Sequence, residues 1–187
     1  MRGSLLLILS FLILGQSSCA AGGDAASTGD AAPPPPDSAG GVRSVQREGF
    51  LLSWTVEGAE AVVTMSAPTT GWVAAGFHTE GAMQNAQIAM GWVDGDAFAL
   101  RDDFGTGFTT HAPDTSLGGT DDLVPVSGTE EGGRTTIVFR MPLDSGDPYD
   151  RILVPGEPCR ALVAYGNDGD DDFTSYHAWA AIVEIEI

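Results

Sequence analysis

The chain has 187 residues, of which 26 are acidic and 8 are basic, and every basic residue is an arginine. The formal net charge of -18 argues against duplex DNA, RNA and anionic membrane surfaces as partners, because binding to phosphate groups needs clustered cations. A hydrophobic fraction of 43% excludes a wholly disordered chain. The length fits one domain or a small pair, so we expect a single working module.

Residues 1–18 are typical of a signal peptide. One positive charge precedes the apolar run 5–14, whose ten residues are too few for a bilayer span of about 20. Two serines stand directly before Cys19, as in the lipobox of bacterial lipoproteins, although Gln16 occupies a position where Leu is usual. We therefore predict export and lipidation at Cys19, which would anchor the protein in a bacterial envelope. The alternative is ordinary secretory cleavage near residues 18–21.

The segment 19–41 is predicted to be a tether. After Cys19 it contains only Ala, Gly, Ser, Thr, Asp and Pro, with four consecutive prolines at 33–36. Such a composition cannot bury enough apolar surface to offset chain entropy. If Cys19 carries lipid, Cys159 has no disulfide partner, so the following domain must be stable through its core alone.

The 146 residues from 42 to 187 (187 minus 41) are expected to form an all-β domain. Apolar residues recur mostly with a period of two, whereas no helical period continues for twelve residues and only 82–87 could form a single turn. Short strands with turn signals between them predict an antiparallel β-sandwich. The expected strands are 50–56, 61–65, 72–77, 87–93, 97–100, 135–139, 161–165 and 182–187.

Several segments of this domain follow one known pattern. They are 71–77 (GWVAAGF), Met83, Ala86, 88–93 (IAMGWV), 111–123 (HAPDTSLGGTDDL), 136–150 (TIVFRMPLDSGDPYD) and the pair Tyr176 and His177. Together they resemble the DOMON domain over about residues 47–187. The resemblance implies an extracytoplasmic, immunoglobulin-like antiparallel β-sandwich that binds haem b or a sugar. In the haem-binding members a Met and a His are the axial ligands of the iron, and Met83 and His177 occupy those positions here.

Each of these two residues also has a simpler interpretation. Met83 lies in a polar, turn-rich segment and could be a flexible apolar side chain that fills the end of the sandwich. His177 could be a surface or structural histidine. The remaining histidines, His78 and His111, are weaker candidates that could replace a ligand.

Other chemistry has little support in the sequence. The acidic runs 144–147 and 167–172 do not have the ligand spacing of an EF-hand, so they are expected to be solvated loops, with Ca²⁺ binding as the alternative. Cys159 lacks a nearby metal-binding or catalytic pattern and should be a buried or half-buried bystander. Hydrolase, phosphate-loop and zinc motifs are absent, so we do not expect an enzyme.

Three functions therefore remain open. The first is an exported, lipid-anchored module that binds haem b through Met83 and His177 and exchanges electrons with an envelope protein. The second is a sugar-binding module that uses its tryptophans, although three of the four lie in strands at positions equally explained by core packing. The third is an interaction domain that docks a basic partner. The tryptophans are Trp54, Trp72, Trp92 and Trp179.

Overall fold

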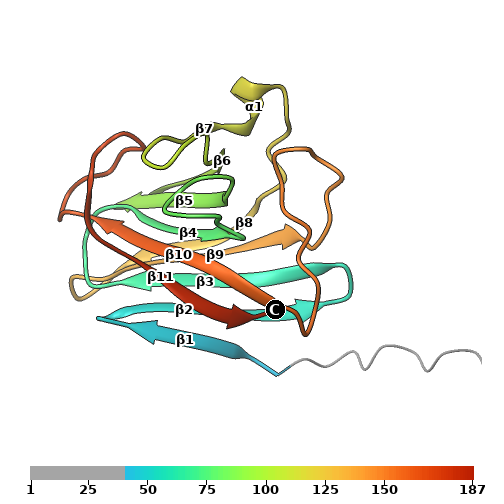
Figure 1. Ribbon diagram of the computed structural model, residues 1–187. Coiled ribbons are helices and arrows are strands. Elements are labelled where there is room, and N and C mark those ends of the chain that lie inside the picture. The colour runs from blue at the N-terminus through green and yellow to red at the C-terminus, as the bar shows by residue number, and fades with distance from the viewer. Residues whose placement is uncertain (1–40) are drawn as a thin grey trace, which may run out of the picture. The chain divides into compact units, whose positions relative to one another are not determined.

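The structure is a computed structural model that describes residues 41–187 (Figure 1). The expected signal peptide, the lipidation site Cys19 and the tether up to residue 40 lie outside the described residues. Within the described part of the chain, no helix is long and apolar enough to cross a membrane.

The described residues form eleven strands and one helical turn. Their bounds are β1 Arg43–Arg47, β2 Phe50–Glu57, β3 Glu60–Ala67, β4 Val73–Phe77, β5 Gln87–Asp94, β6 Ala97–Phe104, β7 Ala112–Pro113, α1 Asp114–Leu117, β8 Val124–Glu130, β9 Thr135–Pro142, β10 Pro158–Gly166 and β11 His177–Glu186.

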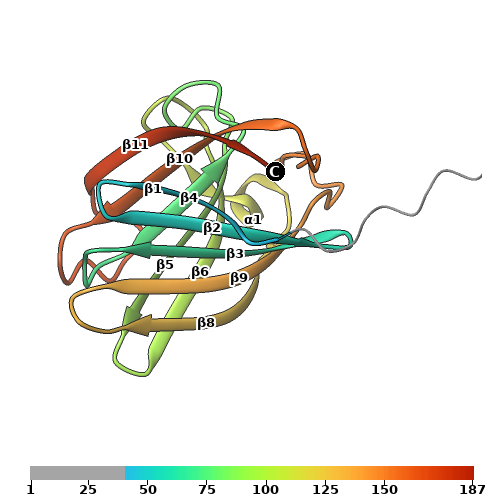
Figure 2. The same ribbon diagram turned by 90° about the horizontal axis from the view of Figure 1, so that it is seen from below.

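The strands are arranged in two antiparallel sheets. The first sheet has the order β1-β2-β3-β9-β8, and the second has the order β11-β10-β4-β5-β6-β7. Figure 2 shows the strands of the first sheet side by side, with β4, β5 and β6 of the second sheet crossing behind them. This architecture confirms the predicted all-β antiparallel sandwich.

The main core lies between the two sheets. Strand β9 shows why it forms, because its residues alternate between buried and half-buried positions along the strand. Ile137, Phe139 and Met141 point inward and are at most 1% exposed. They pack with inward residues of the other strands, such as Leu52 of β2 and Val163 of β10, in one hydrophobic cluster.

The central strands β4 and β5 depart from the expected alternation, since β4 is buried throughout and most of β5 is buried on both faces. Their outward residues belong to a second apolar cluster, on the side of the second sheet that faces away from the first sheet. We call it the outer cluster. Its members are Trp72, Ala74, Ala86, Ile88, Met90, Leu162 and Ala164, with Met83, Trp92, Phe173 and Ile182 packed against them.

The remaining differences from the sequence analysis lie at edges and loops. Edge strands β1 and β8 were not expected, because most of their residues are exposed and neither shows an apolar alternation. The helical turn is α1, whereas the segment expected to contain it forms non-helical turns with a bridge between Gly81 and Gln84. The expected turn at 94–95 is confirmed between β5 and β6.

Candidate functional site

Met83 lies in the loop between β4 and β5 and is fixed by backbone contacts on both sides. Its N–H donates to the carbonyl of Phe108 at 3.3 Å, and its carbonyl accepts the N–H of Ala86 at 3.1 Å. Any Cβ at Gly105 would collide with the Met83 carbonyl, so only glycine fits there. The half-buried Met83 side chain packs on the outer cluster and not on the main core between the sheets.

His177 begins β11 and pairs with Gly166 of β10, next to a bulge in the register. Directly opposed residues of an antiparallel pair project to the same face. A Cβ at Gly166 would meet the Trp72 indole, which belongs to the outer cluster. His177 therefore lies on the face of the second sheet that carries the outer cluster, on which Met83 also packs. His177 is near Trp72 at the start of β4, whereas the Met83 loop follows the end of β4. The His177 side chain is exposed and makes no hydrogen bond with any described residue.

The surroundings of these two residues are rich in aromatic side chains. Phe108, whose carbonyl holds the Met83 loop, is 63% exposed, and Tyr176, next to His177, is 90% exposed. Within the outer cluster, the indole N–H groups of Trp72 and Trp92 are buried and have no hydrogen-bond partner. This face thus combines apolar surface with unused hydrogen-bond donors.

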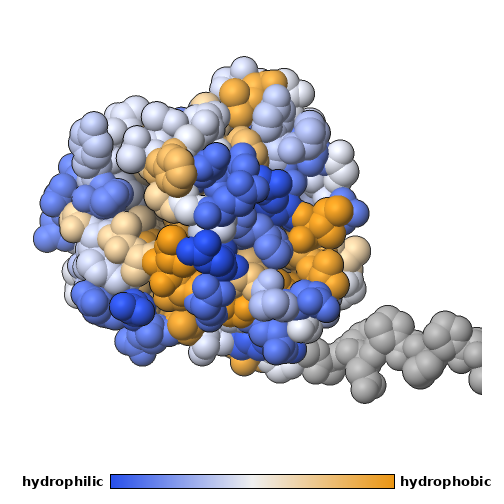
Figure 3. All heavy atoms as spheres, in the orientation of Figure 1, coloured by the Kyte–Doolittle hydropathy of each residue, from blue (hydrophilic) through white to orange (hydrophobic). Residues whose placement is uncertain are grey.

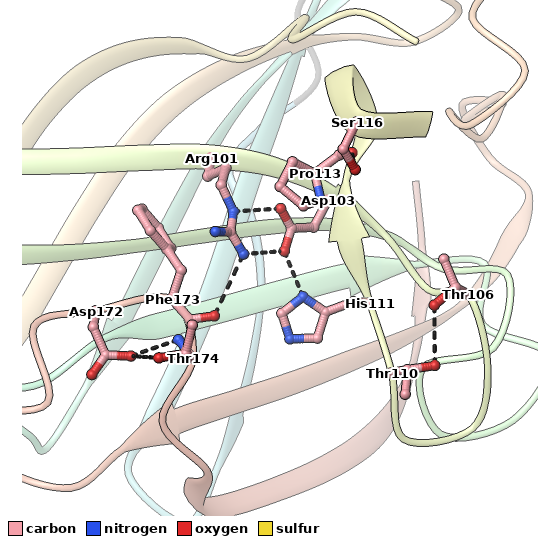
Figure 4. A network of polar contacts seen from close by, with 10 residues as sticks. All are labelled: Arg101, Asp103, Thr106, Thr110, His111, Pro113, Ser116, Asp172, Phe173 and Thr174. Carbon is pink, nitrogen blue, oxygen red and sulfur yellow. Dashed lines mark hydrogen bonds and ion pairs between the residues drawn. The ribbon is translucent and has the colours of Figure 1, made fainter. Parts of the chain in front are cut away.

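A polar network borders the outer cluster along β6. Figure 4 shows Arg101 and His111 converging on the buried carboxylate of Asp103, at 2.6 Å from Arg101 Nε and 2.5 Å from His111 Nδ1. Burial opposes ionisation of Asp103, but the hydrogen bonds from His111 and Arg101 outweigh it and lower the pKa of this carboxyl. Arg101 also lies 4.2 Å from the ring centroid of Phe173. His111 is therefore held in a hydrogen-bond network at the edge of this face.

His78 lies in a different environment. It lines a hollow with Glu80, Arg151 and Ile152, none of which belongs to the outer cluster. Burial, together with the positive charge of Arg151, lowers the pKa of His78. His78 follows directly on β4, in the same loop as Met83, and it stays an alternative ligand.

The other residues singled out in the sequence have structural explanations. Cys159 is buried in the main core as expected, and its sulfur accepts the backbone N–H of His78 at 3.4 Å. In the acidic loop after β10, Asp172 accepts the N–H groups of Thr174 and Ser175 and the hydroxyls of the same two residues. Such contacts within a loop account for Asp172 without a metal ion.

The four tryptophans do not form an exposed stacking platform. Trp54 belongs to the main core, and Trp179 packs against that core and stacks on Tyr165 at a centroid distance of 5.5 Å. Trp72 is only 5% exposed, and the half-buried Trp92 tilts against Phe173. These contacts cover the ring faces on which a sugar would stack.

Sequence reasoning did not single out Arg101, Asp103 or Phe173, which border the outer cluster. Asp103 and His111 are eight positions apart, and Phe173 comes from a distant loop, so no local pattern joins them. The burial of β4 and β5 on both faces was the available signal, since continuous apolar strands indicate a second covered face.

Two solved structures have a similar fold. The cytochrome b domain of pyranose dehydrogenase from Coprinopsis cinerea is 18% identical, with a TM-score of 0.50, covering 72% of this chain and 76% of that chain. The cytochrome domain of cellobiose dehydrogenase from Myriococcum thermophilum is 12% identical, with a TM-score of 0.53, covering 78% of this chain and 81% of that chain. At these identities the likeness concerns the fold.

Comparison at the level of sequence identifies the family. The protein "MOXD1 homolog 2" of Drosophila melanogaster is 27% identical over 118 residues, which are 63% of this chain and 15% of that protein. The chain thus spans a small part of that relative. The sequence profile of the DOMON domain matches residues 46–166, which is more than half of the chain. The chain therefore belongs to the DOMON domain family.

Proposed function

We propose that this protein binds haem b on the outer face of its second sheet, with Met83 and His177 as the axial ligands, and that it transfers electrons without catalysing a reaction of its own. One observation carries the proposal: a thioether and an unpartnered imidazole, separated by 94 positions (177 minus 83), lie on one apolar face of the same sheet.

The donor set fits haem. A Met sulfur and a His nitrogen are the ligand pair of electron-transfer haems, and bound haem would supply a one-electron couple whose potential the Met raises. If Met83 and His177 both hold the iron, the bound haem would supply electron transfer rather than a site for substrate. Covalent attachment would need a Cys-x-x-Cys-His motif, which the sequence lacks, so binding would be of the non-covalent b type.

The unpaired indole N–H groups of the outer cluster also support a ligand with polar groups. Burying an N–H group without a partner costs about 1–3 kcal/mol, and most buried donors in proteins are paired. The indoles of Trp72 and Trp92 leave two such donors on this face. A largely apolar ligand with acceptor groups would satisfy them.

The fold likeness agrees with this proposal. Both solved structures are described as cytochrome domains of dehydrogenases. The net charge of -18 favours a basic redox partner. Figure 3 shows hydrophobic patches divided by hydrophilic residues on the face it presents. Opposite charge on a partner would accelerate association and make it dependent on salt.

A haem titration tests this function directly. Adding haem to the purified apoprotein should produce a saturable absorbance change with one haem per chain and a Kd of about 1 µM or tighter, equivalent to about 8 kcal/mol. His78→Ala should bind haem like the wild type, because the proposal does not use His78 as a ligand. If the wild-type protein does not bind haem at micromolar concentration, the proposal is wrong. Sugar or other ligand binding then remains as the alternative.

We also propose that the mature protein is exported, begins at Cys19 and is anchored by lipid in a cell envelope. The support is the sequence of the N-terminal segment described above. The intact mass of the native protein should equal that of a chain starting at Cys19 with acyl groups added. A mature chain that starts at another residue without lipid would contradict this assignment.

A further inference from the structure

Three aspartates from different parts of the fold converge at one end of the sandwich. Asp102 belongs to β6, Asp114 begins α1, and Asp150 lies in the loop between β9 and β10. One carboxylate oxygen of each lies within 4.8 Å of an oxygen of each of the other two. Figure 1 shows α1 and the orange loop after β9 on the same side of the sandwich, where the Tyr149 hydroxyl donates to the Leu117 carbonyl at 2.9 Å.

These carboxylates are buried and have unused oxygens. Asp114 is 0% exposed and Asp102 is 2% exposed. Both oxygens of Asp114, Oδ1 of Asp102 and Oδ1 of Asp150 have no hydrogen-bond partner. A buried carboxylate with both oxygens unsatisfied is costly, because it loses its hydration without gaining protein donors. Their arrangement therefore points to a ligand that several carboxylate oxygens can bind at once.

The negative charge of this cluster is not neutralised by positive groups of the described residues. None of the three carboxylates forms an ion pair with a described Arg or His. The charged groups that act on them are further carboxylates, those of Asp121 and Asp147 among them. Burial and this mutual repulsion raise the pKa of Asp102 to about 9, of Asp114 to about 7 and of Asp150 to about 6.

From this geometry we infer that Asp102, Asp114 and Asp150 form a binding site for one Ca²⁺ ion. A ligand set of oxygens alone, without His or Cys, selects a hard cation and disfavours zinc or copper. Oxygens that share one Ca²⁺ ion at 2.3–2.6 Å lie at most about 5 Å apart, and the observed separations fall within that limit. Mg²⁺ fits less well, because it retains several waters, and these aspartates are mostly buried.

The ion would act as a cross-link. Residues 102, 114 and 150 are separated by 12 and 36 positions, so one ion would join β6, the turn α1 and the loop after β9. Ca²⁺ binds the folded arrangement and has no comparable site in the unfolded chain, so it stabilises the protein by mass action. The site is distinct from the acidic runs 144–147 and 167–172 and is independent of haem.

Calorimetry and thermal unfolding of the full chain test this inference. After treatment with EDTA and dialysis at pH 8, titration with CaCl₂ should show one site per chain, and 1 mM Ca²⁺ should raise the Tm by several degrees, more than 1 mM Mg²⁺ does. Asp114→Asn, which keeps the side-chain shape, should lose most of both effects. The matched control is Asp96→Asn, in the exposed turn after β5, which should respond to Ca²⁺ like the wild type.

Two results would overturn the site. One is a wild-type protein that neither binds Ca²⁺ nor changes its Tm when Ca²⁺ is added. The other is an Asp114→Asn variant that binds Ca²⁺ with wild-type affinity. If this variant does not fold, Asp150→Asn takes its place in the comparison, since Asp150 is only half-buried and accepts a hydrogen bond from the Ser145 hydroxyl.

Discussion

Replacing His177 by alanine is expected to abolish haem binding, whereas replacing Met83 by leucine should leave a protein that still binds haem but holds its iron in a high-spin state. Imidazole is the stronger iron ligand, and loss of the thioether opens one axial position to exogenous ligands and lowers the potential. Leucine keeps the apolar bulk of Met83 on the outer cluster, so any spectral change reports the sulfur itself. Haem titrations and absorbance spectra of the two variants provide the measurement.

Stability measured without haem distinguishes ligation from packing. His177 is exposed, so His177→Ala should cost about 1 kcal/mol or less, within the range of surface substitutions. Met83→Ala should cost on the order of 1 kcal/mol, less than the roughly 2–5 kcal/mol of truncating a fully buried Met. Met65→Ala, in the main core and 0% exposed, serves as the buried control. If Met83→Ala unfolds the apoprotein while Met83→Leu retains the wild-type haem spectrum, Met83 is a packing residue and the axial assignment is wrong.

The second large effect is a loss of stability as the pH rises in the presence of EDTA. The folded-state pKa values of Asp102, Asp114 and Asp150 lie above the ordinary value of 3.8. The folded protein therefore holds protons that the unfolded chain has released, so stability present below about pH 4 is lost between pH 4 and about pH 9. We expect the free energy of unfolding to fall by several kcal/mol between pH 5 and pH 9, because each unit of pKa difference corresponds to about 1.4 kcal/mol.

Urea unfolding at a series of pH values measures this loss. His78 acts in the opposite direction below its ordinary pKa of 6.5, because its lowered pKa means that the folded state releases a proton more readily than the unfolded chain. Asp102→Asn removes the carboxyl with the largest increase in pKa and should flatten the decline at alkaline pH, whereas Asp96→Asn should not. A wild-type protein that is equally stable at pH 5 and pH 9 in EDTA would contradict the prediction.

The sequence predicted well those strands that bury only one face. Strands such as β9 alternate because one face meets the core, and that alternation can be read from residues 135–139 alone. The edge strand β1 was missed because it is held mainly by its backbone ladder to β2, with only Val45 half-buried. Edge strand β8 contains Pro125 and Gly128 and a register shift, which weaken any strand signal.

The candidate sites were predictable only in part. Met83 and His177 could be proposed from the family pattern, and the register of β10 with β11 then accounts for the face that His177 occupies. The three aspartates could not be found in this way, because residues 102, 114 and 150 converge only through tertiary packing. Asp102 and Asp103 are adjacent in the chain, yet they project to opposite faces of β6, one into the aspartate cluster and the other into the network with Arg101.

The absorbance spectrum of the haem-loaded protein, oxidised and then reduced with dithionite, tests the central claim most directly. Ligation by Met83 and His177 predicts a low-spin spectrum with sharp, resolved bands on reduction, because both ligands together impose a strong axial field. Carbon monoxide should leave this spectrum unchanged, since no position on the iron is free. A high-spin spectrum that shifts on addition of carbon monoxide, or no haem spectrum after haem is added and the excess removed, would contradict the account.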